Sequence, residues 1–170
     1  MGRKGRRGGV SDNLQAPQSL PNEERGSYKV PMTSPLYTTE VLRLAASLKE
    51  PHVLEHEDGR AELRSPTCGS RITLAVQLDE HRRVERLAME VHACAFGQAS
   101  AALVERHSHG RTHDEVSEMM LALSHWLAGD REDCGGWPGI SALASARSRK
   151  ARHGAILLPF RALLAAMEAA

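Results

Sequence analysis

The chain has 170 residues, 41% of them hydrophobic, and a formal net charge of +1. This length and apolar content predict one folded domain with an adequate core. The near-neutral charge excludes a strong electrostatic attraction to nucleic acid or a membrane surface, and no apolar run is long enough to span a bilayer. The start of the chain resembles neither a secretory signal nor a transit peptide, so we expect a reducing, cytoplasmic setting.

The first part of the chain has the composition of a disordered tail. Residues 1–34 contain few apolar side chains and are rich in Gly, Pro, Arg, Ser and Asn. A basic cluster near the start lacks interleaved aromatic residues and any nucleic-acid-binding motif, so we expect no nucleic-acid partner. The folded domain is therefore expected over residues 35–170.

The folded part is expected to begin with a helix and a short strand. Thr38 or Thr39 can cap a helix over residues 39–49, and Pro51 would end it. A short strand is predicted over 60–64. Two runs of alternating apolar residues follow, separated by the polar residues 79–83, which is typical of an antiparallel hairpin.

The apolar positions of this hairpin predict its register. The expected pairs are Ile72 with Val91, Leu74 with Met89, and Val76 with Leu87. A slip of one residue would bring Glu90 onto the buried face, so it is disfavoured. Extending the same register outward sets Gly69 opposite Cys94, with Cys68 one residue further. We therefore expect the two thiols to meet at the open end of the hairpin, within about 5–8 Å.

The second half of the chain is predicted to be helical. We expect a helix over 97–107 closed by Gly110, and then a helix from the capping box Thr112–Glu115 to Gly129. A loop over 130–138, a short helix near 139–146 and a basic loop over 147–152 should follow. The last helix is expected over 158–169, with Pro159 in its first turn. This order predicts an α+β fold with helices packed on one face of a small antiparallel sheet.

Cys68 and Cys94 are the candidate site residues. Cys94 lies where a strand ends and a helix begins, and the free N–H groups of a helix start stabilise a thiolate. Its neighbours are small and leave room for a bulky group, and Cys68 lies in a Pro- and Gly-containing turn. Either cysteine alone is explained more simply by packing, but the predicted pairing of both favours a functional site.

The remaining cysteine and a histidine cluster are weaker candidates. Cys134 is expected to be a free loop cysteine, with a replacement ligand as the alternative. His107, His109 and His113 can in principle bind metal, but they flank the Gly110 turn, which favours a solvated loop. No phosphate-binding glycine loop or hydrolase triad pattern is present in the sequence.

Four motifs together resemble the NifU N-terminal family of iron–sulfur cluster assembly scaffolds, of the IscU and SufU type. They are the cysteine turn over residues 65–70, the small-residue run that begins at Ala93, the stretch 110–115, and the closing helix from Arg152. The similarity extends over about residues 36–168 and implies the SufE/NifU-like fold.

The chain departs from that family at the ligands. The family's Asp after Cys-Gly is Ser70 here, its third cysteine falls on Ala155, and a neighbouring histidine falls on Gly154. His153, one position earlier, remains as a candidate ligand. A [2Fe–2S] unit takes four protein ligands, whereas Cys68, Cys94 and His153 give three. Zinc or a ferrous ion would accept three ligands and a water.

The resemblance implies a scaffold and not an enzyme. Such a protein would hold iron or a [2Fe–2S] cluster transiently through Cys68 and Cys94, with His153 as a further ligand. A cysteine desulfurase would supply the sulfur, client or chaperone proteins would receive the cluster, and the chain would be a monomer or a weak homodimer. Two alternatives are a zinc-containing, SufU-like persulfide acceptor and a degenerate interaction module without metal.

Overall fold

The computed structural model describes residues 1–2, 37–66 and 69–170. Cys68 and almost all of the expected tail, from residue 3 to 34, lie outside the described residues. The elements follow in the order α1 (Thr39–Ala46), β1 (Gly59–Arg64), β2 (Arg71–Leu78), β3 (Val84–His92), α2 (Ala95–His107), α3 (His113–Ala128), the 3₁₀ helix η1 (Ile140–Ala146) and α4 (Lys150–Glu168).

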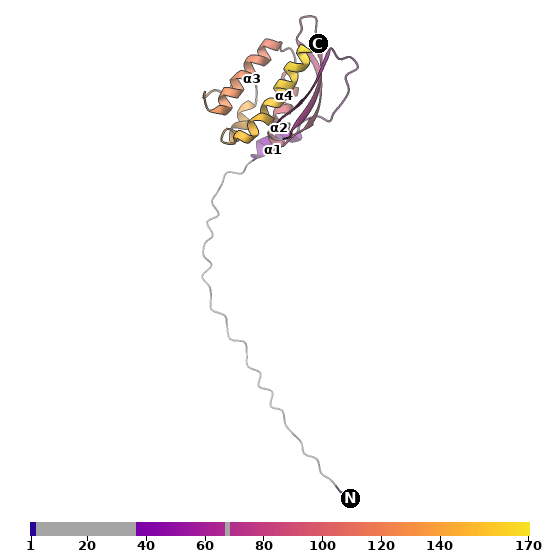
Figure 1. Ribbon diagram of the computed structural model, residues 1–170, viewed down its shortest axis with the longest axis vertical. Coiled ribbons are helices and arrows are strands. Elements are labelled where there is room, and N and C mark those ends of the chain that lie inside the picture. Colours follow the sequence, from indigo (N-terminus) through magenta and orange to yellow (C-terminus); the bar gives the residue numbers. More distant parts are fainter. Residues whose placement is uncertain (3–36, 67–68) are drawn as a thin grey trace. The chain divides into compact units, whose positions relative to one another are not determined.

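The predicted fold class is confirmed. The strands form one antiparallel sheet in the order β1-β2-β3, and the helices cover one of its faces (Figure 1). Helix α4 contacts β1 and β2 on one side and α3 on the other, while α2 packs against both α1 and α4. Among the described residues, no helix is long and apolar enough to cross a membrane.

The predicted register of the β2–β3 hairpin is also confirmed, with Ile72 opposite Val91 and Leu74 opposite Met89. One irregularity lies near the turn, where Gln77 pairs with Arg86 but Leu78 pairs with Val84. The turn is closed by Asp79, whose Oδ1 accepts hydrogen bonds from the N–H groups of His81 (2.9 Å) and Arg83 (2.8 Å). The alternation of apolar residues sets the pairing because only one register buries them all.

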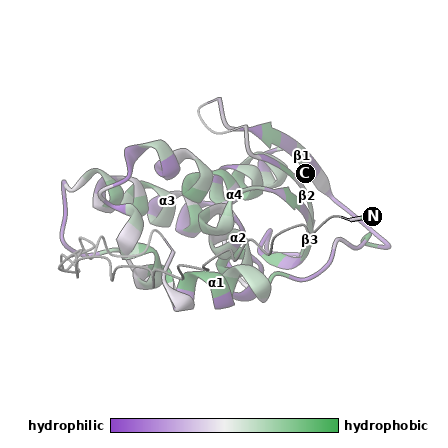
Figure 2. Ribbon diagram, turned by 90° about the horizontal axis from the view of Figure 1, so that it is seen from below, coloured by the Kyte–Doolittle hydropathy of each residue, from purple (hydrophilic) through white to green (hydrophobic). Residues whose placement is uncertain are grey.

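Helix α4 lies at the centre of the core and is apolar on nearly all sides, as a helix covered by neighbours should be. Its buried residues are Ala155, Ile156, Leu157, Leu158, Pro159, Phe160, Ala162, Leu163, Leu164, Ala166 and Met167. Figure 2 shows hydrophobic residues along α4 in the middle of the molecule and mostly hydrophilic loops at its edges. Helix α4 approaches β1 so closely that a β-carbon on Gly59 would overlap the Ala166 carbonyl oxygen.

The prediction for this last helix was wrong at its start. Helix α4 begins at Lys150, so residues 150–152 are helical instead of forming a basic loop, and Pro159 lies inside the helix instead of in its first turn. A proline inside a helix costs about 3 kcal/mol because it removes one backbone hydrogen bond. Burial of each large apolar side chain contributes about 1.5–3 kcal/mol, so the many buried residues around Pro159 offset that cost.

Two other boundaries differ from the prediction. Helix α1 ends at Ala46, before Pro51, and the N–H of its C-cap Ser47 still bonds to Arg43 O (3.1 Å) and Leu44 O (3.0 Å). Helix α2 begins at Ala95, two residues earlier than expected. The capping box of α3 is present as predicted, and the left-handed Gly129 (φ 91°) ends that helix.

Candidate metal and sulfur site

Cys94 joins the end of β3 to the start of α2. It is the N-cap residue of α2, with φ −68° and ψ 170°, and its side chain makes no capping hydrogen bond. The thiol is free and partly exposed, with its buried portion packed against the core. Cys94 is therefore a free cysteine that is not fully buried.

The 65–70 connection, which carries Cys68, leaves the sheet at the end where β3 runs into Cys94. Arg71 of β2 pairs with Arg64 on one side and with His92 on the other, so the 65–70 connection and Cys94 both follow directly from these paired residues. The N–H of Ser65 donates to Ser70 O (2.8 Å), and the N–H of Gly69 donates to Ser65 O (3.1 Å). Cys68 itself lies outside the described residues, so the expected distance between the two thiols stays a prediction.

Ala155, where the sequence resemblance puts the family's third cysteine, lies against the first turn of α2. Ala155 is fully buried. A β-carbon built on Gly97 would lie 3.5 Å from Ala155 Cβ, 3.3 Å from Ala155 O and 2.7 Å from Ala93 Cβ. Gly97 is the third residue of α2, directly after the N-cap Cys94 and two helical residues. The methyl group of Ala155 therefore lies beside the turn of α2 that follows Cys94.

The close approach at Gly97 was missed in the sequence analysis. The signal for it is the run of small residues around Cys94, which we had assigned only to ligand access. Gly97 and Ala101 stand one turn apart on one face of α2, and both are buried. Near them, the hydroxyl of Ser100 donates to Ile156 O at 2.7 Å, which joins the same two helices.

His153 lies in the first turn of α4, in a helix and not in the loop that we expected. Its Nε2 is 3.1 Å from Ala146 O and 3.2 Å from Arg147 O. Carbonyl oxygens only accept hydrogen bonds, so this contact favours the proton on Nε2 and leaves the lone pair on Nδ1. The Nε2 atom is thus engaged by the end of η1, and a ligand role for His153 stays a prediction.

Cys134 lies in the loop after α3, as expected. Its Sγ is 3.8 Å from Gly135 O, and the side chain is partly buried against the core. Within the described part of the chain, no three His, Cys, Asp or Glu side chains are grouped in a way that could hold a metal ion.

The histidine cluster is divided among different partners. His109 Nδ1 lies 3.0 Å from Glu85 O, whereas His113 Nε2 lies 3.2 Å from Glu168 Oε1. His107 ends α2, and burial lowers its pKa from the ordinary value, with a further lowering by Arg106 and Arg111. His107 and His113 thus lie in helices and not in the solvated loop that we expected.

The chain matches the family described as NifU-like N terminal domain over residues 36–130. It belongs to this family. The resemblance to iron–sulfur cluster assembly scaffolds is thereby confirmed at the level of the family. The match ends before His153 and Ala155, so it says nothing about the third ligand position of this NifU-like domain.

Solved structures share the NifU-like fold. The crystal structure of a nitrogen-fixing NifU-like protein (N-terminal) from Brucella abortus is 29% identical, with a TM-score of 0.70 over 78% of this chain and 92% of that chain. A candidate iron–sulfur cluster assembly scaffold protein for the SUF system from Fervidobacterium islandicum is 23% identical, with a TM-score of 0.70 over 78% of this chain and 96% of that one. The second likeness shows the fold alone. No curated protein matches the chain.

Proposed function

We propose that this NifU-like domain is a scaffold-type protein that carries iron and sulfide transiently on Cys68 and Cys94. The observation that supports it is the free, partly exposed Cys94 thiol at the start of α2, at the end of the sheet from which the 65–70 loop also leaves. Thiolates are the usual protein ligands of iron–sulfur clusters. Iron and sulfide are cargo in this proposal and not a resident cofactor.

The incomplete ligand set fits a carrier better than a permanent site. A [2Fe–2S] unit takes four protein ligands, whereas the two cysteines supply two and position 155 is a buried methyl. His153 would add a third ligand through Nδ1, or through Nε2 once it leaves the carbonyls of η1. A partner protein or a second copy of the chain would supply the rest, so the cluster would be held weakly and released readily.

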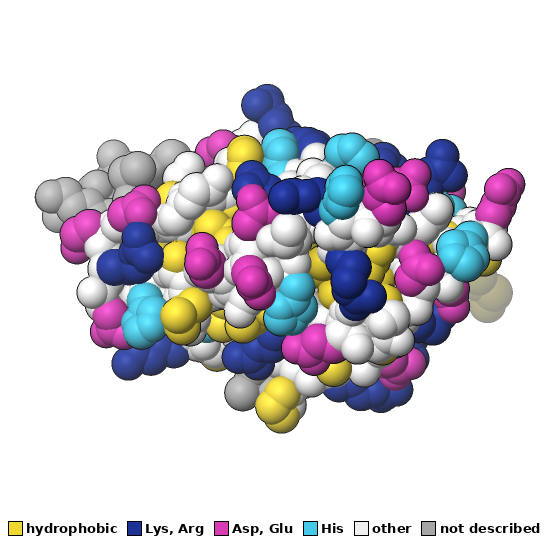
Figure 3. Space-filling view, turned by 90° about the horizontal axis from the view of Figure 1, so that it is seen from above, with side chains coloured by type: hydrophobic (Ala, Val, Ile, Leu, Met, Phe, Trp, Pro, Cys, Tyr) yellow, Lys and Arg dark blue, Asp and Glu magenta, His cyan; other side chains and the backbone are white. Residues whose placement is uncertain are grey.

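The proposed role is a binding role without catalysis, in the cytoplasm, by a monomer or weak homodimer. A cysteine desulfurase would deliver the sulfur, and client or chaperone proteins would take the assembled cluster. The mixed surface charge gives no support for a nucleic-acid partner: Figure 3 shows acidic, basic and histidine side chains interspersed over one face of the molecule.

A second candidate function is that of a sulfur acceptor in which zinc is structural. It is favoured because Cys94 is a free, partly exposed cysteine and the proposed ligand set for a cluster is incomplete. The Cys94 thiolate attacks the outer sulfur of a persulfide on the desulfurase, a new S–S bond forms at Cys94, and the desulfurase thiolate leaves. A third possibility, an interaction module that has lost its metal, is favoured by the methyl group at Ala155.

Reconstitution with iron and sulfide tests these candidates. Protein purified without oxygen is analysed for iron, sulfide and zinc, then reconstituted and desalted. We expect charge-transfer absorbance that is lost in Cys68→Ala and Cys94→Ala and kept in the matched control Cys134→Ala. Zinc alone, with faster desulfurase turnover, would support the persulfide acceptor. No metal, no absorbance and no effect on turnover would leave only the interaction module.

A further inference from the structure

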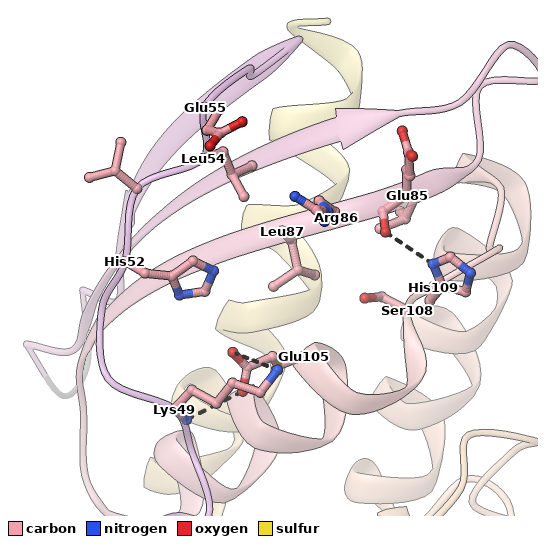
Figure 4. A pocket seen from close by; sticks show the side chains of 12 residues that line it. Lys49, His52, Leu54, Glu55, Glu85, Arg86, Leu87, Glu105, Ser108 and His109 are labelled. Atoms are coloured by element: carbon pink, nitrogen blue, oxygen red, sulfur yellow. Dashed lines mark hydrogen bonds and ion pairs between the residues drawn. The ribbon is translucent and has the colours of Figure 1, made fainter.

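A cavity of about 390 Å³ lies between the segment that follows α1, strand β3 and the end of α2. Figure 4 shows the side chains that line it from these three parts of the chain. Neither Cys94 nor His153 lines it, so it is separate from the candidate metal and sulfur site. Its volume falls in the range of small-molecule sites, about 300–1,000 Å³.

A nearly buried carboxylate on α2, that of Glu105, lines this cavity. Its side chain is only 8% exposed. Its Oε2 accepts one long hydrogen bond, of 3.3 Å, from the N–H of Lys49, and its Oε1 lies 3.9 Å from Lys49 Nζ. A carboxylate can accept about four hydrogen bonds, and those from an ammonium group are about 2.7–2.9 Å long. Glu105 therefore has unused capacity for a closer cationic donor.

Lys49 shows which kind of group this carboxylate attracts. Its ammonium approaches Glu105 without reaching hydrogen-bond distance, and its side chain is 72% exposed, so little holds it in place. Among the residues that the structure describes, no three His, Cys, Asp or Glu side chains are grouped so that they could hold a metal ion. A metal ion would thus find too few ligands in the cavity, whereas an ammonium group needs only this carboxylate.

A second buried polar group, the hydroxyl of Ser108, lies one helical turn after Glu105. Its N–H donates to Val104 O (3.0 Å), so the helical geometry of α2 extends to it. Ser108 is 1% exposed, and Figure 4 shows its hydroxyl oxygen directed into the cavity. This hydroxyl makes no hydrogen bond with any residue that the structure describes, which is costly unless a ligand or water reaches it. The β-carbons of helix residues three positions apart are about 5–6 Å apart, so one small ligand can reach both side chains.

The strand side of the cavity supplies apolar surface. Leu87 of β3 is 8% exposed and points from the strand toward α2 in Figure 4, and Leu54 lies nearby on the segment after α1. Successive strand residues face opposite sides of a sheet, so the exposed Arg86 belongs to the other face and takes no part in this site. The cavity thus combines an undersupplied carboxylate, a hydroxyl without a partner and an apolar wall.

We propose that this cavity binds a small amino alcohol, with its ammonium and hydroxyl groups on adjacent carbons and a short apolar side chain. The ammonium group bonds to Glu105 and displaces Lys49 Nζ, while the hydroxyl group pairs with that of Ser108. The apolar side chain rests on Leu54 and Leu87. The inference does not depend on the proposed function of the cysteines.

Three related ligands separate the parts of this proposal. The full ¹⁵N-labelled chain is titrated with leucinol, with 4-methylpentan-2-amine, which lacks the hydroxyl, and with 4-methylpentan-1-ol, which lacks the ammonium. We expect leucinol to shift the amide signals of Leu87, Glu105 and Ser108. Its dissociation constant should be about tenfold or more below that of the alcohol and about threefold or more below that of the amine. Absence of these shifts, or equal binding of either analogue, would overturn the proposal.

Lys49→Met tests the displacement directly. It removes the competing ammonium from an exposed residue, so the variant is expected to fold. Leucinol should bind about threefold or more tightly than to the unmodified chain, whereas the affinity for 4-methylpentan-1-ol should stay the same. The matched control Lys150→Met, exposed at the start of α4, should change neither affinity. Unchanged or weaker leucinol binding in Lys49→Met would refute an ammonium site at Glu105.

Glu105→Gln tests the carboxylate. It should weaken leucinol binding by about tenfold or more and leave the affinity for 4-methylpentan-1-ol unchanged, which would show that the cavity itself is intact. The matched control is Glu80→Gln, whose side chain is 86% exposed on the hairpin turn. Equal leucinol affinity in Glu105→Gln and Glu80→Gln would refute the proposal. If Glu105→Gln does not fold, the result for Lys49→Met decides.

Discussion

Ala155 of α4 packs against Gly97 of α2: a β-carbon on Gly97 would lie 3.3 Å from Ala155 O and 3.5 Å from Ala155 Cβ. Gly97 is in the turn that Cys94 caps, and the N–H of Gln98 donates to Cys94 O at 2.9 Å. A side chain at position 155 therefore lies beside the turn that begins at Cys94. In the proposed function, the methyl group of Ala155 leaves Cys68 and Cys94 without a third thiolate.

Ala155→Cys should supply the missing thiolate. We expect reconstituted Ala155→Cys to retain iron and sulfide through desalting for longer than the unmodified chain, because a third thiolate replaces weaker ligands. The measurement is the decay of charge-transfer absorbance, with iron and sulfide analysis after each desalting step. Ala169→Cys adds a thiol at the exposed end of the same helix and should change nothing. Equal decay in both variants would mean that position 155 does not reach the metal.

Cys94→Ser should separate metal binding from folding. Cys94 is an N-cap residue without a capping hydrogen bond, and serine is among the best N-cap residues. We expect the free energy of unfolding to rise by about 0.5–1 kcal/mol while iron binding is lost. Urea unfolding and metal analysis of the same preparation give both values. If Cys94→Ser instead lowers the free energy of unfolding by more than about 1 kcal/mol, the sulfur contributes mainly to packing.

Gly59→Ala should destabilise the fold strongly. A β-carbon at Gly59 would overlap Ala166 O and come within 2.9 Å of Ala170 N, both of them backbone atoms that cannot turn aside. We expect the free energy of unfolding, measured with urea, to fall by about 2–3 kcal/mol, which is the usual cost of forcing an extra carbon into a packed core. Gly136→Ala is the matched control, because a β-carbon there meets nothing within 4 Å. A similar small effect of both substitutions would contradict the close packing of β1 on α4.

Asp79 should make the β2–β3 hairpin sensitive to acid. Hydrogen bonds from the backbone, first that of Arg83 and then that of His81, lower the pKa of Asp79 from its ordinary value of 3.8. Because the folded-state pKa is the lower one, this contribution to stability is present above the unfolded-state pKa and is lost as the pH falls through the folded-state value. Below about pH 4, the unmodified chain should therefore lose stability more steeply than Asp79→Asn.

Urea unfolding at a series of pH values between neutral and acidic conditions measures this difference. Glu80→Gln removes the neighbouring carboxylate without touching the bonds to His81 and Arg83, so it should keep the slope of the unmodified chain. Parallel curves for the unmodified chain and Asp79→Asn would mean that these hydrogen bonds do not distinguish the two charge states of the carboxyl group.

Local patterns in the sequence were sufficient for the hairpin and for α3. Strand residues alternate between two faces, so Ile72 and Leu74 could pair with Val91 and Met89 in only one way that buries them all. The capping box of Thr112 and Glu115 depends on residues three positions apart, so it also could be read directly. The motifs around the two cysteines likewise lie in short segments, and they were enough to indicate the family.

The start of α4, the contact of Ala155 with Gly97 and the burial of Glu105 were decided only by the tertiary structure. Residues 150–157 and Pro159 are helical because the sheet, α2 and α3 surround them, and no local signal reports that burial. The Glu105 side chain is covered because the segment after α1 passes beside α2. Such contacts join residues that are far apart in the chain. Their energies depend on which surfaces meet, and short-range periodicity and capping carry no information about that.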